Sequence, residues 1–305
     1  MAGTKNKIVT FLVVIFVGFP VLLIGAAFLW FRIEGKTNGV VVTSGQTRKY
    51  FLYVPRTYDR SKKTPLLISL HAGALRPEAQ MEISRWDDLA DEHGFIVIYP
   101  SGSRLPRVWP MGTISLGRDV KYISDLIDKV ESEYTIDPTR IYADGMSNGG
   151  GMAFALSCKL SDRIAAVGAV ASAQMLEWKR CGDSRPVPTI FFHGTADRFA
   201  PYLGGTSPIA PGPFPGIPDW AARVAQRNQC RGNPIETQVT ANVRRLSYTN
   251  CTGNADVVLY TIAGGGHTWP GGEHLPEWIA GRTTDDISAD RVMWDFFLQH
   301  PLASK

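Results

Sequence analysis

From residue 40 onward, short apolar runs rich in β-branched residues alternate with amphipathic stretches, and no other feature constrains the fold as strongly. The predicted strands are 40–42, 50–54, 66–70, 95–99, 141–143, 164–171, 189–192 and 257–262. The predicted helices are 81–92, 120–134, 152–157, 221–228 and 292–298. Such alternation is typical of an α/β fold with a mostly parallel central sheet and helices on both faces. The proline-rich segment 208–218 interrupts it, and we expect a surface loop there.

The totals exclude several classes of protein. A composition of 44% hydrophobic and 20% charged residues is that of a globular chain, not of a disordered or fibrous one. The formal net charge of +4 is small and no Lys/Arg run exceeds two residues, so we expect no nucleic-acid partner. An α/β domain of about 200 to 250 residues often stands alone. We therefore predict two parts, an N-terminal segment 1–36 and one α/β domain 37–305.

Residues 8–31 form an uninterrupted apolar stretch without a charged residue. As a helix it would span about 36 Å, more than a hydrocarbon core of about 30 Å. Lys5 and Lys7 precede it, which favours a cytoplasmic N-terminus with the rest of the chain outside. A buried core helix fits poorly because no second, polar face is present. The sequence predicts a transmembrane helix that anchors the protein in the membrane.

A cleaved signal peptide is the alternative for this segment. The small residues 25–27 could form its cleavage site, but the apolar run continues to Phe31 and is longer than a signal peptide requires. We favour the uncleaved anchor. Either way, the domain lies outside the cytoplasm, membrane-anchored or secreted. The four cysteines form no C-x-x-C pair, so zinc is not expected; an even number in an exported chain predicts disulfides, with three possible pairings.

The segment Gly145-Met146-Ser147-Asn148-Gly149 fits the pattern G-x-S-x-G. Alone, the pattern recurs by chance, but here it follows a predicted strand and opens a predicted helix, as a nucleophile elbow does. Larger side chains two residues before and after the serine would collide in so sharp a turn. The helix N-terminus favours negative charge developing at the serine. We predict that Ser147 is a nucleophile; a glycine-rich turn with an incidental serine is the alternative.

A serine needs a histidine to take its proton, and in this type of fold the order along the chain is Ser, acid, His. Of the six histidines, His267 fits because it follows the predicted strand 257–262 and three glycines that let the loop bend back. An ordinary loop histidine is the alternative. His274 is the nearest rival. A metal site of His267, Glu273 and His274 would lack further ligands nearby, so we expect no metal and no cofactor.

The acid that orients this histidine is expected at the end of the preceding strand. Asp197 occupies that place, five residues after strand 189–192. The other possible place, after strand 164–171, holds no carboxylate before Glu177. Asp197 therefore fits best, although an Asx-turn or a helix cap would also explain an aspartate there.

An alkoxide formed during acyl transfer needs fixed hydrogen-bond donors. We expect the backbone N–H of Asn148, directly after the nucleophile, to be one of them. The other is expected in the turn after strand 66–70, at the N–H of Gly73. His71 in this turn is interpreted as a turn-stabilising side chain.

Three stretches, 142–150, 192–197 and 264–272, together resemble the polyhydroxybutyrate depolymerase and feruloyl esterase group of the α/β-hydrolase superfamily, including the related bacterial lipoprotein-type esterases. The similarity runs from about Thr47 to the C-terminus. It implies a triad of Ser147, Asp197 and His267 in an exported esterase for aromatic, short-acyl or polymeric esters. It also implies disulfides between Cys230 and Cys251 and between Cys158 and Cys181.

Two departures from the resemblance bear on function. The family usually has His-Gly after the oxyanion strand, whereas this chain has Ala72, whose methyl group could narrow the entrance or shift the Gly73 donor. The N-terminal segment is also longer than a typical secretion signal. We expect Trp269 and Trp109 to line the substrate pocket, with hydrophobic packing as the alternative. The rival functions are a peptidase of the same fold and a catalytically silent, membrane-anchored binding protein. The acyl and alcohol groups and the oligomeric state do not follow from the sequence.

Overall fold

The computed structural model describes residues 37–103, 106–111, 113–182, 184–209 and 213–303. The predicted membrane helix at 8–31 lies outside these residues and stays a prediction. Within the described part, no helix is long and apolar enough to cross a membrane. Residues Thr37–Lys305 form one compact unit.

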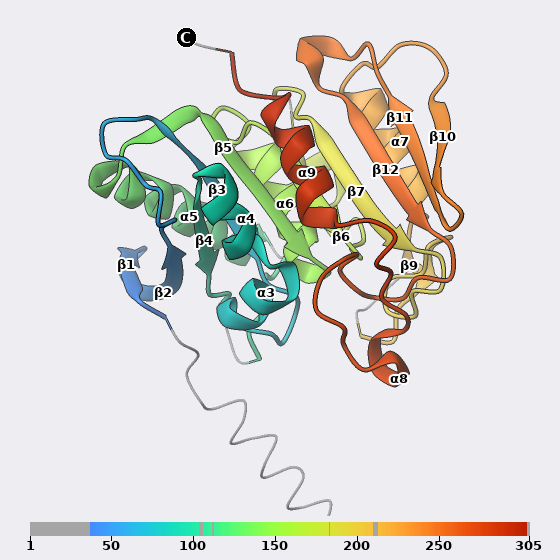
Figure 1. The fold of residues 1–305 in the computed structure, drawn as a ribbon, viewed down its shortest axis with the longest axis horizontal. Coiled ribbons are helices and arrows are strands. Elements are labelled where there is room, and N and C mark those ends of the chain that lie inside the picture. Colours follow the sequence, from blue (N-terminus) through green and yellow to red (C-terminus); the bar gives the residue numbers. More distant parts are fainter. Residues whose placement is uncertain (1–36, 104–105, 112, 183, 210–212, 304–305) are drawn as a thin grey trace, which may run out of the picture. The chain divides into compact units, whose positions relative to one another are not determined.

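The described residues form one ten-stranded sheet in the order β1-β2-β4-β3-β5-β6-β7-β12-β11-β10 (Figure 1). The strands are β1 (Gly39–Thr43), β2 (Gln46–Tyr53), β3 (Thr64–Leu70), β4 (Ile96–Pro100), β5 (Ile136–Met146), β6 (Val167–Val170), β7 (Thr189–Gly194), β10 (Ile235–Thr240), β11 (Val243–Tyr248) and β12 (Val257–Ile262). The six inner strands, from β4 to β12, are parallel, and antiparallel strands flank them on both edges. The predicted mostly parallel sheet is confirmed.

Helices cover both faces of this sheet, as expected (Figure 1). They are α3 (Pro77–Ser84), α4 (Trp86–His93), α5 (Thr113–Glu133), α6 (Asn148–Lys159), α7 (Ile217–Arg227) and α9 (Ala289–Leu298). The short helix α8 (Glu277–Ala280) lies beyond the strand ends (Figure 1). Side chains alternate across β3, so Leu66 and Ile68 join the core under α5, α6 and α7, while Leu67 joins the core under α4 and α9. Two apolar layers therefore hold the central strands rigidly and fix where those strands end.

Three local features differ from the predictions. The predicted helix 81–92 is two helices, because Arg85 has a φ of 55° and ends α3. The segment 208–218 is not a loop throughout. Pro213–Phe214 forms the short strand β9, paired with β8 (Gly205–Thr206), and α7 starts at Ile217. Proline is tolerated in the first turn of α7 because the N–H it lacks has no partner there. The hairpin of β10 and β11 was not predicted.

Two disulfides are present, Cys158–Cys181 and Cys230–Cys251, and they are the two pairs that the family resemblance implied. The first joins the end of α6, the helix behind Ser147, to the residue after the short 3-10 helix Trp178–Arg180. The second joins the chain beyond α7 to the chain beyond β11. Each cross-link restricts the unfolded chain and so stabilises the fold.

Candidate active site

Ser147 occupies a sharp turn between β5, which ends at Met146, and α6, which starts at Asn148. Its φ of 54° and ψ of −120° lie in a region that side-chain-bearing residues rarely adopt. Two hydrogen bonds hold this conformation: the Ser147 N–H donates to the carbonyl of Val170 at 2.8 Å, and the Ser172 hydroxyl donates to the Ser147 carbonyl at 2.7 Å. The backbone is thus fixed from the neighbouring strand.

The glycines around Ser147 are required by close backbone contacts. A Cβ atom on Gly145 would lie 2.4 Å from the carbonyl carbon of Gly149, and one on Gly149 would lie 2.0 Å from the carbonyl oxygen of Leu70. A Cβ atom on Gly150 would lie 2.7 Å from that of Ser172. These distances leave no room for a side chain at the three positions, and at Gly145 and Gly149 this is what the sequence pattern implied for an elbow at Ser147.

Asp197 lies just beyond the end of β7, with its side chain wholly buried. Its Oδ2 atom lies 2.8 Å from Nδ1 of His267. Its Oδ1 atom accepts hydrogen bonds from the backbone N–H groups of Phe199 and Ala200, both at 2.8 Å. The Asx-turn and the acid are therefore not alternatives, because one oxygen makes the turn and the other contacts the histidine.

The environment of Asp197 favours its ionised form. Burial by itself would raise the pKa of Asp197, but hydrogen bonds from His193 and His267 outweigh it and hold this pKa below its usual range. An ionised carboxylate at this place orients the imidazole of His267 and stabilises its protonated form.

His267 follows β12 through the run Gly264–Gly266, and close packing explains more of this run than flexibility does. A Cβ atom on Gly266 would lie 2.1 Å from the carbonyl oxygen of Ala280. The His267 N–H donates to the same carbonyl at 2.6 Å, and the His267 ring packs edge-on against Phe199 at 5.2 Å. Ser147, Asp197 and His267 thus follow the carboxyl ends of β5, β7 and β12, which lie within four neighbouring strands (Figure 1).

The rival roles of His274 do not fit its surroundings. More than half of its side chain is exposed, and its Nε2 atom lies 3.0 Å from Asp285, whose hydrogen bond raises the pKa of His274. Within the described ranges, no group of three or more His, Cys, Asp or Glu residues could hold a metal ion.

The two predicted oxyanion donors lie side by side. A Cβ atom on Gly73 would lie 3.5 Å from Cβ of Asn148, so the turn after β3 adjoins the start of α6. Among the residues that the structure describes, no acceptor is bonded to the backbone N–H of either residue. Both donors are therefore free for a ligand.

Buried side chains hold the turn that carries Gly73. Burial lowers the pKa of His71 to about 4, so its ring is neutral. Its Nδ1–H donates to the Ala72 carbonyl at 2.8 Å, and its Nε2 accepts the Gly102 N–H at 2.9 Å. The indole N–H of Trp109 donates to the His71 carbonyl at 3.0 Å. His71 is thus a turn-stabilising side chain, as expected.

The side chain of Asn148 has a partner of its own. Its amide accepts the Trp109 N–H at 2.6 Å and donates to the Trp109 carbonyl at 2.9 Å. This pair of bonds joins the elbow to the segment that holds the oxyanion turn.

Ala72 is accommodated without backbone strain. It is 6% exposed, packs with the core under α4 and α9, and its φ is not positive. The positive φ in this turn, 63°, belongs to Ala74, whose N–H donates to the Arg107 carbonyl at 2.7 Å. The methyl group of Ala72 is therefore part of the core.

The two tryptophans expected to line a substrate pocket are buried instead. Trp269 is 0% exposed and packs edge-on against Trp86, with ring centroids 6.4 Å apart. Trp109 is 1% exposed and holds His71. Neither side chain offers appreciable surface to a substrate, so hydrophobic packing describes both.

His193 is the residue near the site that sequence reasoning missed. It lies in β7, 2% exposed, with Nε2 at 3.3 Å from Oδ2 of Asp197. Its signals in the sequence were its place four residues before the acid, at the end of an apolar strand, and its presence in the stretch 192–197 that carries the family resemblance.

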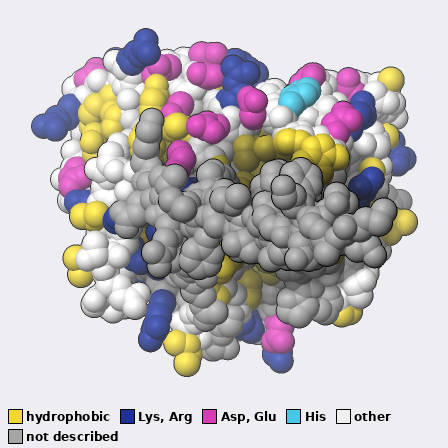
Figure 2. All heavy atoms as spheres, turned by 90° about the horizontal axis from the view of Figure 1, so that it is seen from below, with side chains coloured by type: hydrophobic (Ala, Val, Ile, Leu, Met, Phe, Trp, Pro, Cys, Tyr) yellow, Lys and Arg dark blue, Asp and Glu magenta, His cyan; other side chains and the backbone are white. Residues whose placement is uncertain are grey.

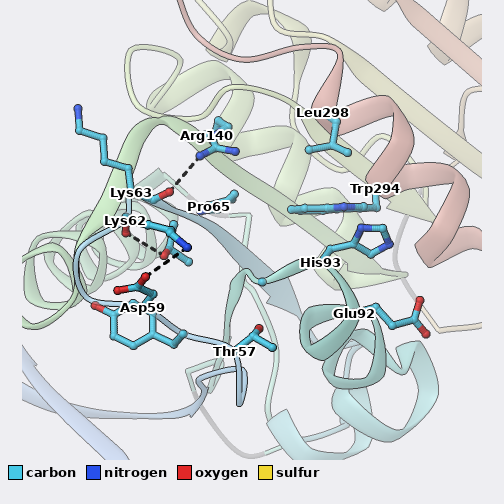
Figure 3. A pocket seen from close by; sticks show the side chains of 13 residues that line it. Thr57, Asp59, Lys62, Lys63, Pro65, Glu92, His93, Arg140, Trp294 and Leu298 are labelled. Atoms are coloured by element: carbon cyan, nitrogen blue, oxygen red, sulfur yellow. Dashed lines mark hydrogen bonds and ion pairs between the residues drawn. The ribbon is translucent and has the colours of Figure 1, made fainter.

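A cavity of about 450 Å³ lies at the opposite end of the sheet, where β3 starts and near the start of β5 (Figure 3). Lys62, Lys63, His93, Arg140 and Trp294 are among its lining residues. Two of its charged groups have local partners: Lys62 pairs with Asp59 at 3.3 Å, and Arg140 donates to the Lys63 carbonyl at 3.1 Å. None of the predicted site residues lines it.

Comparison with known proteins finds relatives of this chain. The sequence profile described as esterase PHB depolymerase matches residues 48–180. The chain is 33% identical to feruloyl esterase B of Piromyces equi over 72% of its own length, and 26% identical to feruloyl esterase D of Neurospora crassa over 97%. The chain is a relative of the PHB depolymerase and feruloyl esterase group. It spans 42% of the Piromyces protein and 99% of the Neurospora protein.

A solved structure with the same fold as this chain supports the assignment of its architecture. An acetyl xylan esterase from Aspergillus awamori superposes with a TM-score of 0.61, at 14% identity, over 86% of this chain and 99% of its own. The shared architecture is the α/β-hydrolase fold, in which the ends of parallel strands carry the reacting groups.

Proposed function

We propose that this protein is a serine esterase that hydrolyses carboxylic esters through an acyl-enzyme formed on Ser147. The observation that carries the proposal is the 2.8 Å contact between Asp197 and His267 at the same sheet edge as the strained Ser147. Similarity to proteins named feruloyl esterase supports the same reaction class.

In the proposed mechanism, Ser147 Oγ attacks the ester carbonyl while Nε2 of His267 takes its proton. Asp197 holds the resulting imidazolium through Nδ1. The N–H groups of Gly73 and Asn148 receive the oxyanion. His267 then protonates the leaving alcohol. In the second half of the reaction, water attacks the acyl-enzyme while His267 takes its proton, and His267 returns a proton to the departing Ser147 Oγ.

The surroundings favour an ester with an apolar part. The segments that follow Asp197 and His267 carry exposed apolar side chains, Leu203 at 85% and Trp278 at 81%. Hydrophobic side chains also gather on the face seen in Figure 2, the end toward which the parallel strands point in Figure 1. We propose feruloyl, acetyl or hydroxyalkanoate esters as the substrate class.

The proposed location is outside the cytoplasm. Two disulfides are typical of exported proteins, and residues 8–31 would anchor the chain in the membrane unless a peptidase removes them.

The test uses the full-length protein with p-nitrophenyl acetate and a fluorophosphonate probe. We expect Ser147→Ala to abolish both hydrolysis and labelling. His267→Ala should lose about 10³-fold or more in kcat, whereas the matched control His274→Ala should retain wild-type activity. Full hydrolysis by Ser147→Ala would overturn the proposal.

The same preparation separates the rival functions. Absence of a covalent adduct on wild-type Ser147 would favour a silent binding protein. Faster turnover of an amide than of the matched ester would favour a peptidase. A panel of acetyl, butyryl, feruloyl and hydroxybutyrate esters then identifies the acyl group.

A further inference from the structure

His193 lies in β7, paired in register with Thr261 of β12, and its ring is buried beneath the turn that carries Asp197. Its Nε2 atom lies 2.8 Å from the carbonyl oxygen of Ala200 and 3.3 Å from Oδ2 of Asp197. The Ala200 carbonyl can only accept a hydrogen bond, and Asp197 is held ionised, so both neighbours are acceptors. Nε2 must therefore carry the hydrogen, which it shares between the two oxygens.

We propose that His193 is a positioning residue that acts through Asp197: its Nε2–H fixes Oδ2 as the acceptor for His267. This inference rests on the proposed function, in which His267 is the base. His193 does not touch the reacting atoms, so its effect on the reaction passes through the carboxylate.

The set of donors around Asp197 supports this role. Oδ1 accepts two backbone N–H groups, from Phe199 and Ala200, and Oδ2 faces the rings of His267 and His193. A carboxylate has about four acceptor positions, so the four donors occupy all of them. The Asp197 side chain is fully buried, so in the native protein these donors and not bulk water stabilise its charge.

The place of His193 in the fold explains why this donor fixes an orientation. The two backbone donors to Oδ1 lie in the same turn as Asp197 and would move with it. His193 belongs to a strand that β6 and β12 hold from both sides. Its imidazole contacts the turn at both Asp197 and Ala200, and thereby ties the turn to the sheet.

The shared oxygen also gives the contact an electrostatic consequence. The positive end of the His193 N–H dipole lies at the same Oδ2 atom that His267 contacts, which disfavours additional positive charge on His267. Tyr202 is also near the His193 ring, with 6.1 Å between the ring centroids. Removing the His193 donor should therefore move the acid limb of the activity profile to higher pH.

A matched pair of amide variants tests the inference in the full-length protein. The amide nitrogen of His193→Gln can reach the position of Nε2, whereas that of His193→Asn is too short. We expect His193→Asn to lose about 10- to 100-fold in kcat with KM within twofold, because a hydrogen bond to a charged group is lost. The midpoint of the acid limb in the pH profile of kcat/KM should move to higher pH by a few tenths of a unit. His193→Gln should restore most of the rate and the wild-type limb.

The outcomes separate this inference from the proposed function. If His193→Asn lowers Tm but leaves kcat and the acid limb unchanged, His193 only packs the turn and the inference is overturned. If Ser147→Ala stays active, the proposed function itself fails. If His193→Asn does not fold, His193→Met carries the same expectations. In the Asp197→Asn background, replacing His193 should lower kcat no further; an additional loss would mean that His193 acts by another route.

Discussion

The two ends of the parallel strands differ in how they treat polar groups. At the carboxyl ends, Asp197 and His71 are buried, and their polar side-chain atoms have fixed partners. At the amino ends, charged side chains line a cavity of about 450 Å³, and Lys62 and Lys63 are exposed (Figure 3). We assign the proposed reaction to the carboxyl ends because of this restricted geometry and not because of cavity volume, since catalysis depends on groups held in place before the substrate arrives.

The largest expected effect is the loss of activity on replacing Asp197, the proposed acid at the carboxyl ends of the strands. Asp197→Asn should reduce kcat/KM for p-nitrophenyl acetate by about 10⁴-fold, because an amide cannot stabilise the imidazolium and favours the wrong tautomer. Steady-state kinetics at pH 7 to 8 measure it. Asp285→Asn, which removes the exposed partner of His274, is the control and should match the wild type. A loss below tenfold for Asp197→Asn would mean that the buried pair does not act as the acid and base.

The second effect concerns the elbow. Gly149→Ala should lower the free energy of unfolding by more than about 3 kcal/mol, since its methyl group would lie 2.0 Å from the Leu70 carbonyl oxygen. Urea unfolding measures the change. The matched control is Gly117→Ala in α5, where a Cβ atom meets nothing within 4 Å. That variant should gain up to about 1 kcal/mol, because alanine favours the helix. Equal stability of the two variants would contradict the structure of the turn.

The third effect is a pH dependence of stability. The pKa of Asp197 is lower in the folded protein than its ordinary value of 3.8, so the stabilisation is present above that value and is lost as the pH falls. Between pH 5 and pH 3, wild-type protein should lose about 1 kcal/mol of unfolding free energy more than Asp197→Asn does. Urea unfolding at both pH values tests this, and parallel curves for the two proteins would rule it out.

The smallest effect is expected at the amino end. Lys63→Ala and His93→Ala change exposed lining residues of the cavity and should leave kcat/KM within about twofold and stability within about 0.5 kcal/mol. The same ester assay and a thermal melt suffice. A tenfold loss of activity in either variant would show that the amino-end cavity takes part in the reaction.

The sequence predicted the inner strands well because their side chains are buried on both faces, which gives unbroken apolar runs such as 66–70. It missed β10 because that strand lies at the edge and Ile235, Glu236 and most of its neighbours are exposed, so burial imposes no apolar pattern. The break at Arg85 was invisible for another reason. Arginine gives no local signal for the positive φ that separates α3 from α4.

The candidate site divides in the same way. The places of Ser147, Asp197 and His267 after the ends of β5, β7 and β12 were predictable from chain order and the apolar strand pattern. The contact of the Asn148 amide with Trp109 joins residues 39 positions apart, and no local pattern announces it. The burial of Trp269 was equally hidden, since an aromatic residue beside a reactive histidine serves a pocket or a core, and only the packing against Trp86 distinguishes them.

The backbone of Ser147 has a consequence for protein engineering. Its φ of 54° and ψ of −120° suit glycine better than any residue with a side chain. A Ser147→Gly protein should therefore melt at a higher temperature than the natural chain while hydrolysing nothing. Selection for thermal robustness alone would favour that inactive form, so an evolution experiment on this scaffold must screen for turnover at every round. The same variant would be a durable vehicle for trapping intact esters in crystals.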